Sequence, residues 1–467
     1  MSAICLEELL AKFENVQELE CRDVSDGKAT LHVLYLFSLC DDKAIAEHIL
    51  RPLMENWQGR QTPEYVMTEI LQIPNVQEPE DMKDAIRRLL MGQALVFFPQ
   101  QKRAIACFVR FCALRSVDIP QTETVIKGPR EGFTEDLRQN LSAIRRRIQS
   151  PDLKTEEFCL GEQTHTRTVL LYMEGLAPEK LLNYVRKKIS GLQTKFTIYP
   201  NHVENVLRCR HTPFDTTGYT EKPDVAVAKL AEGRIVIVTD GCPFVITAPL
   251  FFHENFHTTD DYTVNPFLAN MGRTFRWASF IMSTFIPGLY LALVTYHFKL
   301  VPNIFLYRLV LFRAGVPVPT VIELLYMMLF FQIIREAGVR LPHPIGPTLS
   351  IVGALILGEA AVTSGLASQI TVVIVAITSI ASYLSPTLHA PAFIWAVAIV
   401  GMAALIGLPG FYMGFVLFVA HVAGLTSCGY PFLFPLGTAK TFRYKDLIFR
   451  GKLEDIDAAP LPKDENA

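Results

Sequence analysis

The segment "SIVGALILGEAAVTSGLASQITVVIVAITSIASYL" (residues 350–384) carries a single charged side chain, that of Glu359. This scarcity of charge extends from Leu341 to Gly437, where Glu359 is the only Asp, Glu, Lys or Arg residue. A helix that spans a bilayer needs ~20 mostly apolar residues, because charged side chains are costly in the hydrocarbon core. The sequence therefore predicts a helical membrane domain, which we place at residues 271–437.

Six apolar runs in this domain are candidate spans: 275–297, 318–334, 346–366, 369–388, 391–408 and 410–425. The run 300–313 is short and contains two arginines, so we expect it to lie at the membrane interface or to re-enter the bilayer. With six spans, three basic clusters fall on the cytoplasmic side. If 391–425 is instead one helix kinked at Pro409-Gly410, five spans result, and the basic residues after Gly437 argue against this.

The first 270 residues are polar, and the whole chain has a formal net charge of −2, which offers no general attraction for nucleic acid. The segment "MSAICLEELLAKFENVQELE" (1–20) lacks the apolar core of a signal peptide, so we expect this region to stay in the cytosol. The nine cysteines show neither a CxxC pair nor a Cys/His cluster with a zinc-site spacing. We therefore expect reduced thiols without a metal.

Two parts of the polar region are similar to each other. "LYLFSLCDDKAIAEHI" (34–49) and "LYMEGLAPEKLLNYVR" (171–186) each predict a strand, a turn and an amphipathic helix. Further along, "GQALVFFPQQKRAIACFVR" (92–110) and "GRIVIVTDGCPFVITAP" (233–249) each predict a hairpin that follows a helical segment. The shared order of four elements favours a duplicated α/β unit over chance similarity.

We therefore expect an α+β polar region of two duplicated α/β subdomains, followed by an all-α polytopic membrane domain with five to six spans. The expected bounds are 1–120 for the first subdomain, 121–160 for a linker with an amphipathic helix, 161–270 for the second subdomain, 271–437 for the membrane domain and 438–467 for a cytoplasmic tail. A duplicated pair of this kind could clasp a ligand or could act as a scaffold.

The expected linker contains "VIKGPREGFTEDLRQNLSAIRRRI" (125–148). Its apolar residues at 133, 137, 141, 144 and 148 form one helical stripe, and an arginine triplet (145–147) complements the helix dipole in the last turn. Such arginines are commonly solvated or ion-paired. Because "KGPREG" lacks the P-loop spacing, we expect no nucleotide or nucleic-acid binding here.

This segment resembles a signature of the A subunits of nutrient germinant receptors in spore-forming bacteria, the GerA-type family, which includes the related stage V sporulation protein AF. Where the family usually has Thr-Glu-Arg-Pro-Asp, this chain carries Lys222 in place of the arginine, which would lose bidentate pairing with a carboxylate. The similar motifs that follow in the family's order are "TEKPD" (220–224), "DDY" (260–262), "REAGVRLP" (335–342), "IGPTLSIVG" (345–353), "GEAAV" (358–362) and "SCGYPFLFP" (427–435).

The resemblance implies a germinant receptor A subunit in the spore inner membrane, surrounded by membrane lipid, with its amino-terminal domain in the cytoplasm. It further implies a permease-like B subunit and a lipoprotein C subunit as partners, and a homo-oligomer of A subunits. In that family the complex senses nutrients and triggers germination. The A subunits would form an ion channel that couples sensing to ion release.

Glu359 is the candidate pore or gate residue, because an ionisable side chain inside a membrane helix usually faces a water-filled path or a neighbouring subunit. Glu323 is a second candidate, although its place near the end of a span would also let its carboxylate reach the interface. The candidates for subunit coupling are charged residues of the family motifs: Arg130, Glu131, Arg145, Arg146, Arg147, Arg335, Glu336 and Arg340.

Two other interpretations remain open. A membrane transporter or permease component would be expected to show internal repeats among its membrane helices, and we see repetition only in the polar region. A direct nutrient-binding sensor would clamp the agonist in its duplicated domain and have no role in a pore. The sequence has no GxSxG or GxGxxG motif, so we expect neither catalysis nor a cofactor.

Overall fold

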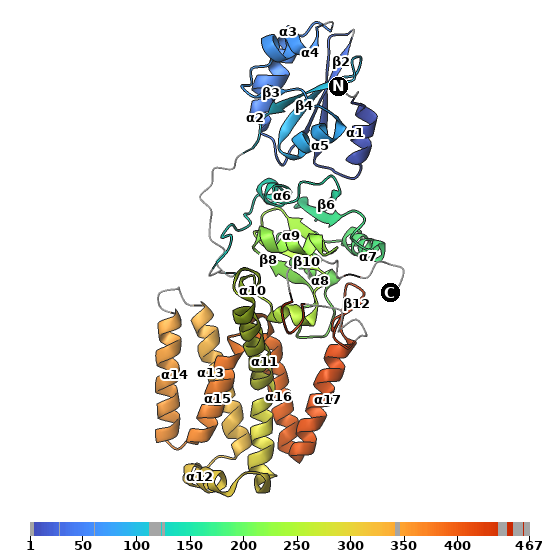
Figure 1. Cartoon of the computed structure of the whole chain (residues 1–467). Helices are drawn as coiled ribbons and strands as arrows, with labels where there is room; N and C mark the ends of the chain where they lie inside the picture. The colour runs from blue at the N-terminus through green and yellow to red at the C-terminus, as the bar shows by residue number, and fades with distance from the viewer. Residues whose placement is uncertain are drawn as a thin grey trace.

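The computed structural model describes residues 4–27, 29–59, 61–111, 123, 127–340, 346–437, 446–451 and 461, and for 346–351 only the backbone. Two α/β units are stacked end to end on a bundle of long helices, which gives the molecule an elongated shape (Figure 1). The amino-terminal unit lies farthest from the bundle, and the second unit lies between the two.

The first unit is built on a five-stranded sheet of order β1-β2-β4-β5-β3, in which all neighbouring strands are antiparallel. Both faces of β2 are buried, because Val33 and Tyr35 pack on one side and Leu34 and Leu36 on the other. The strands are β1 (Leu19–Ser25), β2 (Thr30–Leu36), β3 (Val76–Gln77), β4 (Gln93–Phe98) and β5 (Arg103–Phe108). The helices are α1 (Leu6–Lys12), α2 (Asp42–Ile45), η1 (Ala46–Leu50), α3 (Arg51–Asn56), α4 (Pro63–Tyr65), η2 (Val66–Ile70) and α5 (Met82–Leu90).

The second unit repeats this topology, since its sheet has the order β6-β7-β9-β10-β8 with antiparallel neighbours throughout. This agreement in strand order is what the sequence repeat leads one to expect. The strands are β6 (Leu153–Leu160), β7 (Thr166–Met173), β8 (Gly218–Thr220), β9 (Ile235–Thr239) and β10 (Val245–Ala248). The helices are α6 (Leu137–Arg145), α7 (Glu179–Ser190), α8 (Asn201–Leu207) and α9 (Pro223–Ala231).

Helix α6 and strand β6 belong to the second unit, whereas the sequence assigned residues 121–160 to a linker. The apolar stripe of α6 includes Leu141 and Ile144, which are fully buried against Val236 and Val238 of β9. An exposed linker could not bury this apolar stripe, so α6 packs against the sheet of the second unit. The second unit therefore begins before residue 161.

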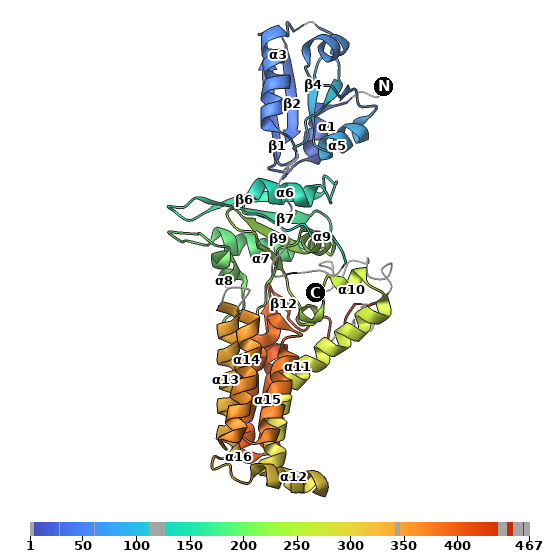
Figure 2. The ribbon, with the colours of Figure 1, turned by 90° about the vertical axis from the view of Figure 1, so that its left-hand side faces the viewer.

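The rest of the described chain is mainly helical. Figure 2 shows the amino-terminal half of α11 leaning away from the other long helices, and α12 lying across the far end of the bundle. The helices are η3 (Phe252–Phe256), α10 (Asp260–Thr263), α11 (Pro266–Thr295), η4 (Phe298–Leu300), α12 (Asn303–Arg313), α13 (Thr320–Arg340), α14 (Gly346–Thr363), α15 (Gln369–Ser382), η5 (Pro386–Leu388), α16 (His389–Ile406) and α17 (Leu408–Gly424). Two short strands, β11 (Thr426–Ser427) and β12 (Tyr430–Pro431), follow them.

Two of the described helices are long and apolar enough to cross a membrane, namely 266–295 and 386–406. Of three shorter apolar helices, those at 369–382 and 408–424 pack against α11, whereas the one at 352–363 packs against α13 and α15. Each of the six candidate spans in the sequence coincides with one helix, from α11 to α17 with α12 omitted. Length and composition thus support two spans directly, and the other four remain a proposal.

The last apolar run forms two helices rather than one kinked helix. Gly407 has a φ of +68°, a conformation that glycine adopts readily, and it separates α16 from α17. The break lies two residues before the expected Pro409, which instead occupies the first turn of α17, where its missing N–H is harmless. The two helices then pack side by side as a hairpin (Figure 1).

Candidate functional site

The first arginine of the triplet in α6 joins the two α/β units. Arg145 is fully buried, and its Nε donates to Oε1 of Glu18 at 3.2 Å, while its Nη1 donates to the carbonyl of Ser150. Glu18, which precedes β1, is itself buried and accepts a hydrogen bond from Ser38, which follows β2. Because a buried charge needs a partner, this ion pair fixes α6 of the second unit against the first.

Further contacts cross the same boundary. Arg138 of α6 donates to both carboxylate oxygens of Asp42, at 2.6 and 2.8 Å, and to the carbonyl of Cys40. Thr155 of β6 donates its backbone N–H to Asn15 at 3.1 Å, next to a parallel bridge between Val16 and Thr155. The two units are therefore held by an ion pair, a bidentate contact and backbone hydrogen bonds.

The other two arginines of the triplet bind a carboxylate that precedes α6 in the chain. Arg146 and Arg147 donate to opposite oxygens of Glu131, at 2.7 and 2.6 Å. Burial by itself would raise the pKa of Glu131, but the hydrogen bonds and charges of Arg147 and Arg146 hold it below its ordinary value. Arg130 is exposed. The paired members of this motif thus have partners within the chain, and their use between subunits remains a proposal.

Lys222, the residue that departs from the family motif, is fully buried at the start of α9. Its Nζ lies 3.1 Å from Oδ2 of Asp224, so the cation does contact a carboxylate, and it does so with one atom. The hydroxyl of the neighbouring Thr220 donates to Glu123 at 2.8 Å. An arginine at position 222 could form two parallel hydrogen bonds to a carboxylate.

The helical region contains a cavity of about 1060 Å³. Its wall is mostly apolar and is formed by residues of α11, α13, α14, α15 and α16 together with Tyr383. The ionisable and amide side chains in this wall are Gln332, Arg335, Glu359, Tyr383 and His389. Helix α14 carries Glu359 on this wall, so the carboxylate that the sequence analysis singled out lies at the cavity.

Arg335 is fixed at the cavity wall by neutral groups. Its Nη1 donates to Oγ of Ser382 at 3.0 Å and to Nδ1 of His389, and its guanidinium lies 4.6 Å from the ring centroid of Tyr383. His389 in turn contacts Oε1 of Gln332 through Nε2 at 2.9 Å, which assigns the proton of the ring to Nε2. Within the described part of the chain, Arg335 thus forms its hydrogen bonds and its ring contact with uncharged side chains.

The neighbours of Arg335 in its motif lie elsewhere. Glu336 and Arg340 form an exposed ion pair at 2.6 Å, one turn apart on α13, and neither lines the cavity. An exposed pair of this kind contributes little to stability, ~0.3–0.5 kcal/mol. The motif "REAGVRLP" is therefore divided between a cavity residue and surface residues, and its last two residues lie outside the described part of the chain.

Glu323 does not reach the interface, since its side chain is fully buried. Its Oε1 accepts hydrogen bonds from the backbone N–H and the hydroxyl of Ser368, at 2.6 and 2.7 Å. Ser368 caps α15, and the hydroxyl of Thr371 links it onward to Tyr290 of α11 at 3.0 Å. Glu323 does not line the cavity, so its location supports a structural contact between α13 and α15 rather than a place on an ion path.

The "DDY" motif forms a buried charged cluster where the second unit meets α11. Asp261 accepts from Nε of Arg273 at 2.9 Å and from Nη2 of Arg276 at 2.5 Å. Burial would raise the pKa of Asp261, but the hydrogen bonds and charges of Arg276 and Arg273 hold it below its ordinary value. Arg273 also donates to Asp446 at 2.5 Å, which brings the expected tail back to the first long helix.

Asp446 and Arg450 were missed from the sequence, because they lie in a segment interpreted only as a tail. Arg450 Nη1 donates to the carbonyl of Asp261 at 2.6 Å, and Tyr262 donates its hydroxyl to Asp446 at 2.6 Å. The available signal was the acidic pair at 260–261, followed 12 and 15 residues after Asp261 by arginines at the start of an apolar run. Such charges need partners when the run enters a membrane.

An aromatic cluster lies beside these charges and includes part of the motif "SCGYPFLFP". Phe432 is fully buried against Phe214 and Phe252, and Phe256 stacks on Trp277 of α11 with ring centroids 3.8 Å apart. The hydroxyl of Ser427, just after α17, donates to the carbonyl of Thr216 at 2.5 Å. The second unit is therefore packed tightly against both α11 and the end of α17.

Residues 253–257 read His-Glu-Asn-Phe-His and match the HExxH pattern of zinc proteases, so the interpretation that the sequence lacks this motif is wrong. The geometry differs from that of such enzymes, since residues 253–256 lie on the short 3₁₀ helix η3 and His257 follows it in an extended conformation. Glu254 is bound by Arg234 and Lys229, and Nε2 of His257 contacts the carbonyl of Leu447 at 2.8 Å. The pattern serves here as a packed structural element.

The motifs that follow one another along the sequence are explained by a match to a known protein family. The model of the family described as "Bacillus/Clostridium GerA spore germination protein" matches residues 7–461. The chain belongs to the GerA family. The match covers both α/β units and the helical region, so membership applies to the whole chain and confirms the resemblance found in the sequence.

Several GerA relatives are similar over most of their length. Spore germination protein KA of Bacillus subtilis (strain 168) is 34% identical over 429 residues, covering 90% of this chain and 78% of the relative. The uncharacterized membrane protein YfkQ of the same organism is 32% identical over 450 residues, covering 95% and 88%. Spore germination protein GerLA of Bacillus cereus is 31% identical over 423 residues, covering 89% and 85%.

One solved structure is also similar, the amino-terminal domain of the A subunit of the Bacillus megaterium spore germinant receptor GerK3. It is 25% identical, with a TM-score of 0.41, and the match covers 54% of this chain and 97% of that one. The chain is thus a member of a family of spore germination proteins, and its two helices long and apolar enough to cross a bilayer fit a membrane protein.

Proposed function

We propose that this chain is the A subunit of a nutrient germinant receptor that couples nutrient sensing to ion release across the spore inner membrane. In this proposal several copies assemble around an ion path, together with a permease-like B subunit and a lipoprotein C subunit. Family membership supports the receptor role. The observation that carries the ion path is Glu359, the one acidic side chain in the wall of the cavity between the helices.

The proposed topology has six spans, with both α/β units in the cytoplasm. Six helices in the positions of the six apolar runs support this, as does the break at Gly407, which returns the chain to the side where α11 began. Arg273, which is buried, and Arg276, which is partly buried, lie at that same end, where basic residues favour the cytoplasmic face. The surface helix α12 lies at the opposite end (Figure 1).

The two α/β units transmit a change of state to the helices in this proposal. Arg145 and Glu18 fix the first unit to the second, and the Asp261 cluster with its neighbouring aromatic residues fixes the second unit to α11 and α17. Packed interfaces of this kind move as units rather than deforming continuously. A shift between subunits at the level of the sheets would therefore reach the helices that line the cavity.

Glu359→Gln tests the ion path, because it removes the charge and keeps the size of the side chain. We expect a loss of nutrient-triggered ion release and of germination by about tenfold or more, since a pore carboxylate acts through its charge. Glu8→Gln is the control, an exposed acid of α1 that does not line the cavity and is not a candidate for subunit coupling. Ion release from spores is measured with ion-selective electrodes and germination by loss of optical density.

Normal ion release, ion selectivity and germination in the Glu359→Gln spores would contradict the ion path. A cavity of about 1060 Å³ with a fixed arginine also suits a small solute, so a permease component is the second candidate function. That function predicts a different result for the same variant, namely normal ion selectivity with a shifted nutrient concentration dependence. A direct sensor that uses only the α/β units predicts no effect of Glu359→Gln.

A further inference from the structure

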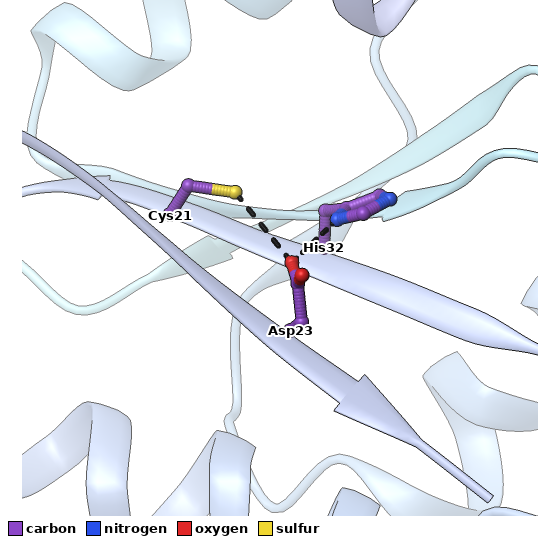
Figure 3. Close-up of side chains that lie close together, drawn as sticks. All are labelled: Cys21, Asp23 and His32. Carbon is purple, nitrogen blue, oxygen red and sulfur yellow. Dashed lines mark hydrogen bonds and ion pairs between the residues drawn. The ribbon is translucent and has the colours of Figure 1, made fainter. Parts of the chain in front are cut away.

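Three side chains that can bind a metal lie together on the edge hairpin of the first sheet (Figure 3). Cys21 and Asp23 are two residues apart on β1 and therefore point to the same face. Asp23 pairs directly with His32 of β2 in the strand register. The thiol sulfur, one carboxylate oxygen and one ring nitrogen all lie within 4.8 Å of one another.

The distances within this Cys21–Asp23–His32 cluster are short. Oδ1 of Asp23 is 2.6 Å from Nδ1 of His32 and 3.9 Å from Sγ of Cys21. Among the described residues, Asp23 pairs with His32 and not with a lysine or arginine. No such cation therefore competes with a metal ion for this carboxylate. Two neighbouring strands of fixed register hold the three side chains, and such a framework keeps ligand positions more precise than a loop would.

The three groups are of the types that Zn²⁺ prefers, since a thiolate, an imidazole and a carboxylate are its usual protein ligands. Cys21 and Asp23 are exposed and His32 is partly buried, so a metal ion has access from solvent. We propose that Cys21, Asp23 and His32 bind one Zn²⁺ ion, with a water molecule as the fourth ligand. Sites with three protein ligands and one open position are an established class of zinc site.

Binding is coupled to the loss of a proton. Zinc would displace the thiol proton to solvent and bind the thiolate. His32 would bind through Nδ1 as the neutral tautomer, so the Nδ1 proton now donated to Asp23 would be lost to solvent and Nε2 would carry the ring proton. Zinc affinity should therefore increase as the pH rises.

No familiar sequence motif marks this cluster. Cys-x-Asp is the spacing of one face of a strand, and His32 joins it only because the β1–β2 turn sets Asp23 opposite His32. The second unit has a partial counterpart, in which Sγ of Cys159 lies 3.8 Å from Nδ1 of His165. Cys159 is not part of a cluster of three such ligands within the described residues, so it provides a matched control.

The test uses the full chain in detergent, without reducing agents that bind metal. Co²⁺ serves as a spectroscopic probe, because a thiolate–cobalt charge-transfer band reports directly on the cysteine ligand. We expect one Zn²⁺ or Co²⁺ per chain for the wild type and for Cys159→Ser. Cys21→Ser should lose the charge-transfer band, and both Cys21→Ser and His32→Ala should weaken zinc binding by at least about tenfold.

Circular dichroism and the denaturation midpoint of each variant show whether its fold is retained; Cys21 is exposed, so its replacement should leave both unchanged. Equal zinc affinity of Cys21→Ser and the wild type would overturn the proposal, as would a charge-transfer band that disappears in Cys159→Ser instead. A wild-type chain that takes up no Zn²⁺ at micromolar concentration would also overturn it.

Discussion

Two glycines occupy equivalent positions in the two α/β units. Gly92 and Gly233 both have φ near +80°, and each lies within two residues of the strand pair that ends its unit. A Cβ at Gly92 would lie 2.9 Å from the carbonyl oxygen of Leu39, and one at Gly233 would lie 2.7 Å from that of Leu176. Leu39 and Leu176 are themselves equivalent in the sequence repeat, so both units need glycine here for the same steric reason.

Gly233→Ala should therefore lower the free energy of unfolding by ~1–3 kcal/mol through the positive φ and the clash together. Gly241→Ala is the matched control, since Gly241 has a φ of +81° but nothing within 4 Å of an added Cβ. It should show only the smaller conformational cost, ~1 kcal/mol. Chemical denaturation of the purified chain measures both, and equal effects of the two substitutions would contradict the steric argument.

A second residue-scale feature is the buried imidazole of His257. Burial, and then the charge of Arg273, lower its pKa from 6.5 to about 4, against the opposing influence of Asp446, the Leu447 carbonyl and Glu254. Between pH 6.5 and 4 the unfolded chain takes up a proton that the folded chain does not, so stability falls as the pH falls through this window. The loss is roughly 3 kcal/mol if the whole shift is realised.

His257→Gln should reduce this loss of stability between pH 6.5 and 4, because the glutamine side chain does not take up a proton in this range. We expect the denaturation midpoint of the variant to change less between pH 6.5 and 4 than that of the wild type. The exposed His202 provides the control, and His202→Gln should retain the wild-type profile. If the denaturation midpoints of His257→Gln and the wild type change equally between pH 6.5 and 4, other groups, such as the buried carboxylates, determine the loss of stability.

At the scale of elements, α6 is the connector between the units. Its Arg145 pairs with Glu18 in the interior, whereas its Arg138 pairs with Asp42 at the surface. Removing one member of a buried pair leaves an uncompensated charge and costs ~3–5 kcal/mol, while an exposed pair contributes ~0–1 kcal/mol. The same helix therefore offers two arginines with different predicted effects.

Arg145→Met should accordingly destabilise the chain by several kcal/mol, and Arg138→Met by about 1 kcal/mol or less. Adding Glu18→Gln to Arg145→Met should restore part of the loss, since the stranded carboxylate is then neutral. Denaturation midpoints of the three variants check this order. Similar costs for Arg145→Met and Arg138→Met would show that the buried pair does not join the units.

At the scale of the whole molecule, the proposed six spans place residues 4–111 and the loop after α12 on opposite sides of the membrane. Maleimide labelling of intact protoplasts should therefore spare the native exposed Cys21 and Cys159 and reach a cysteine introduced by Ala314→Cys. Permeabilisation should expose all three. Labelling of Ala314→Cys only after permeabilisation would place that loop in the cytoplasm and exclude the six-span topology.

The sequence by itself determined the division of this molecule into polar and apolar parts. Charged side chains are costly in a bilayer, so segments that cross it have few of them, and this is visible in the composition. It also determined the repeated order of strands and helices and the family, through ordered local motifs. The place of Glu359 within an apolar helix was equally visible, since a single acid among ~20 apolar residues stands out in any register.

Only the tertiary structure decided which charges meet. The pairing of Arg145 with Glu18 spans 127 residues, that of Arg273 with Asp446 spans 173, and neither partner choice follows from local spacing. Glu323 and Glu359 look alike in the sequence, yet Glu323 accepts hydrogen bonds from Ser368 in the interior and Glu359 lines a cavity. The physical reason is that desolvated charges select their partners by three-dimensional packing, which hydrophobic periodicity along the chain does not encode.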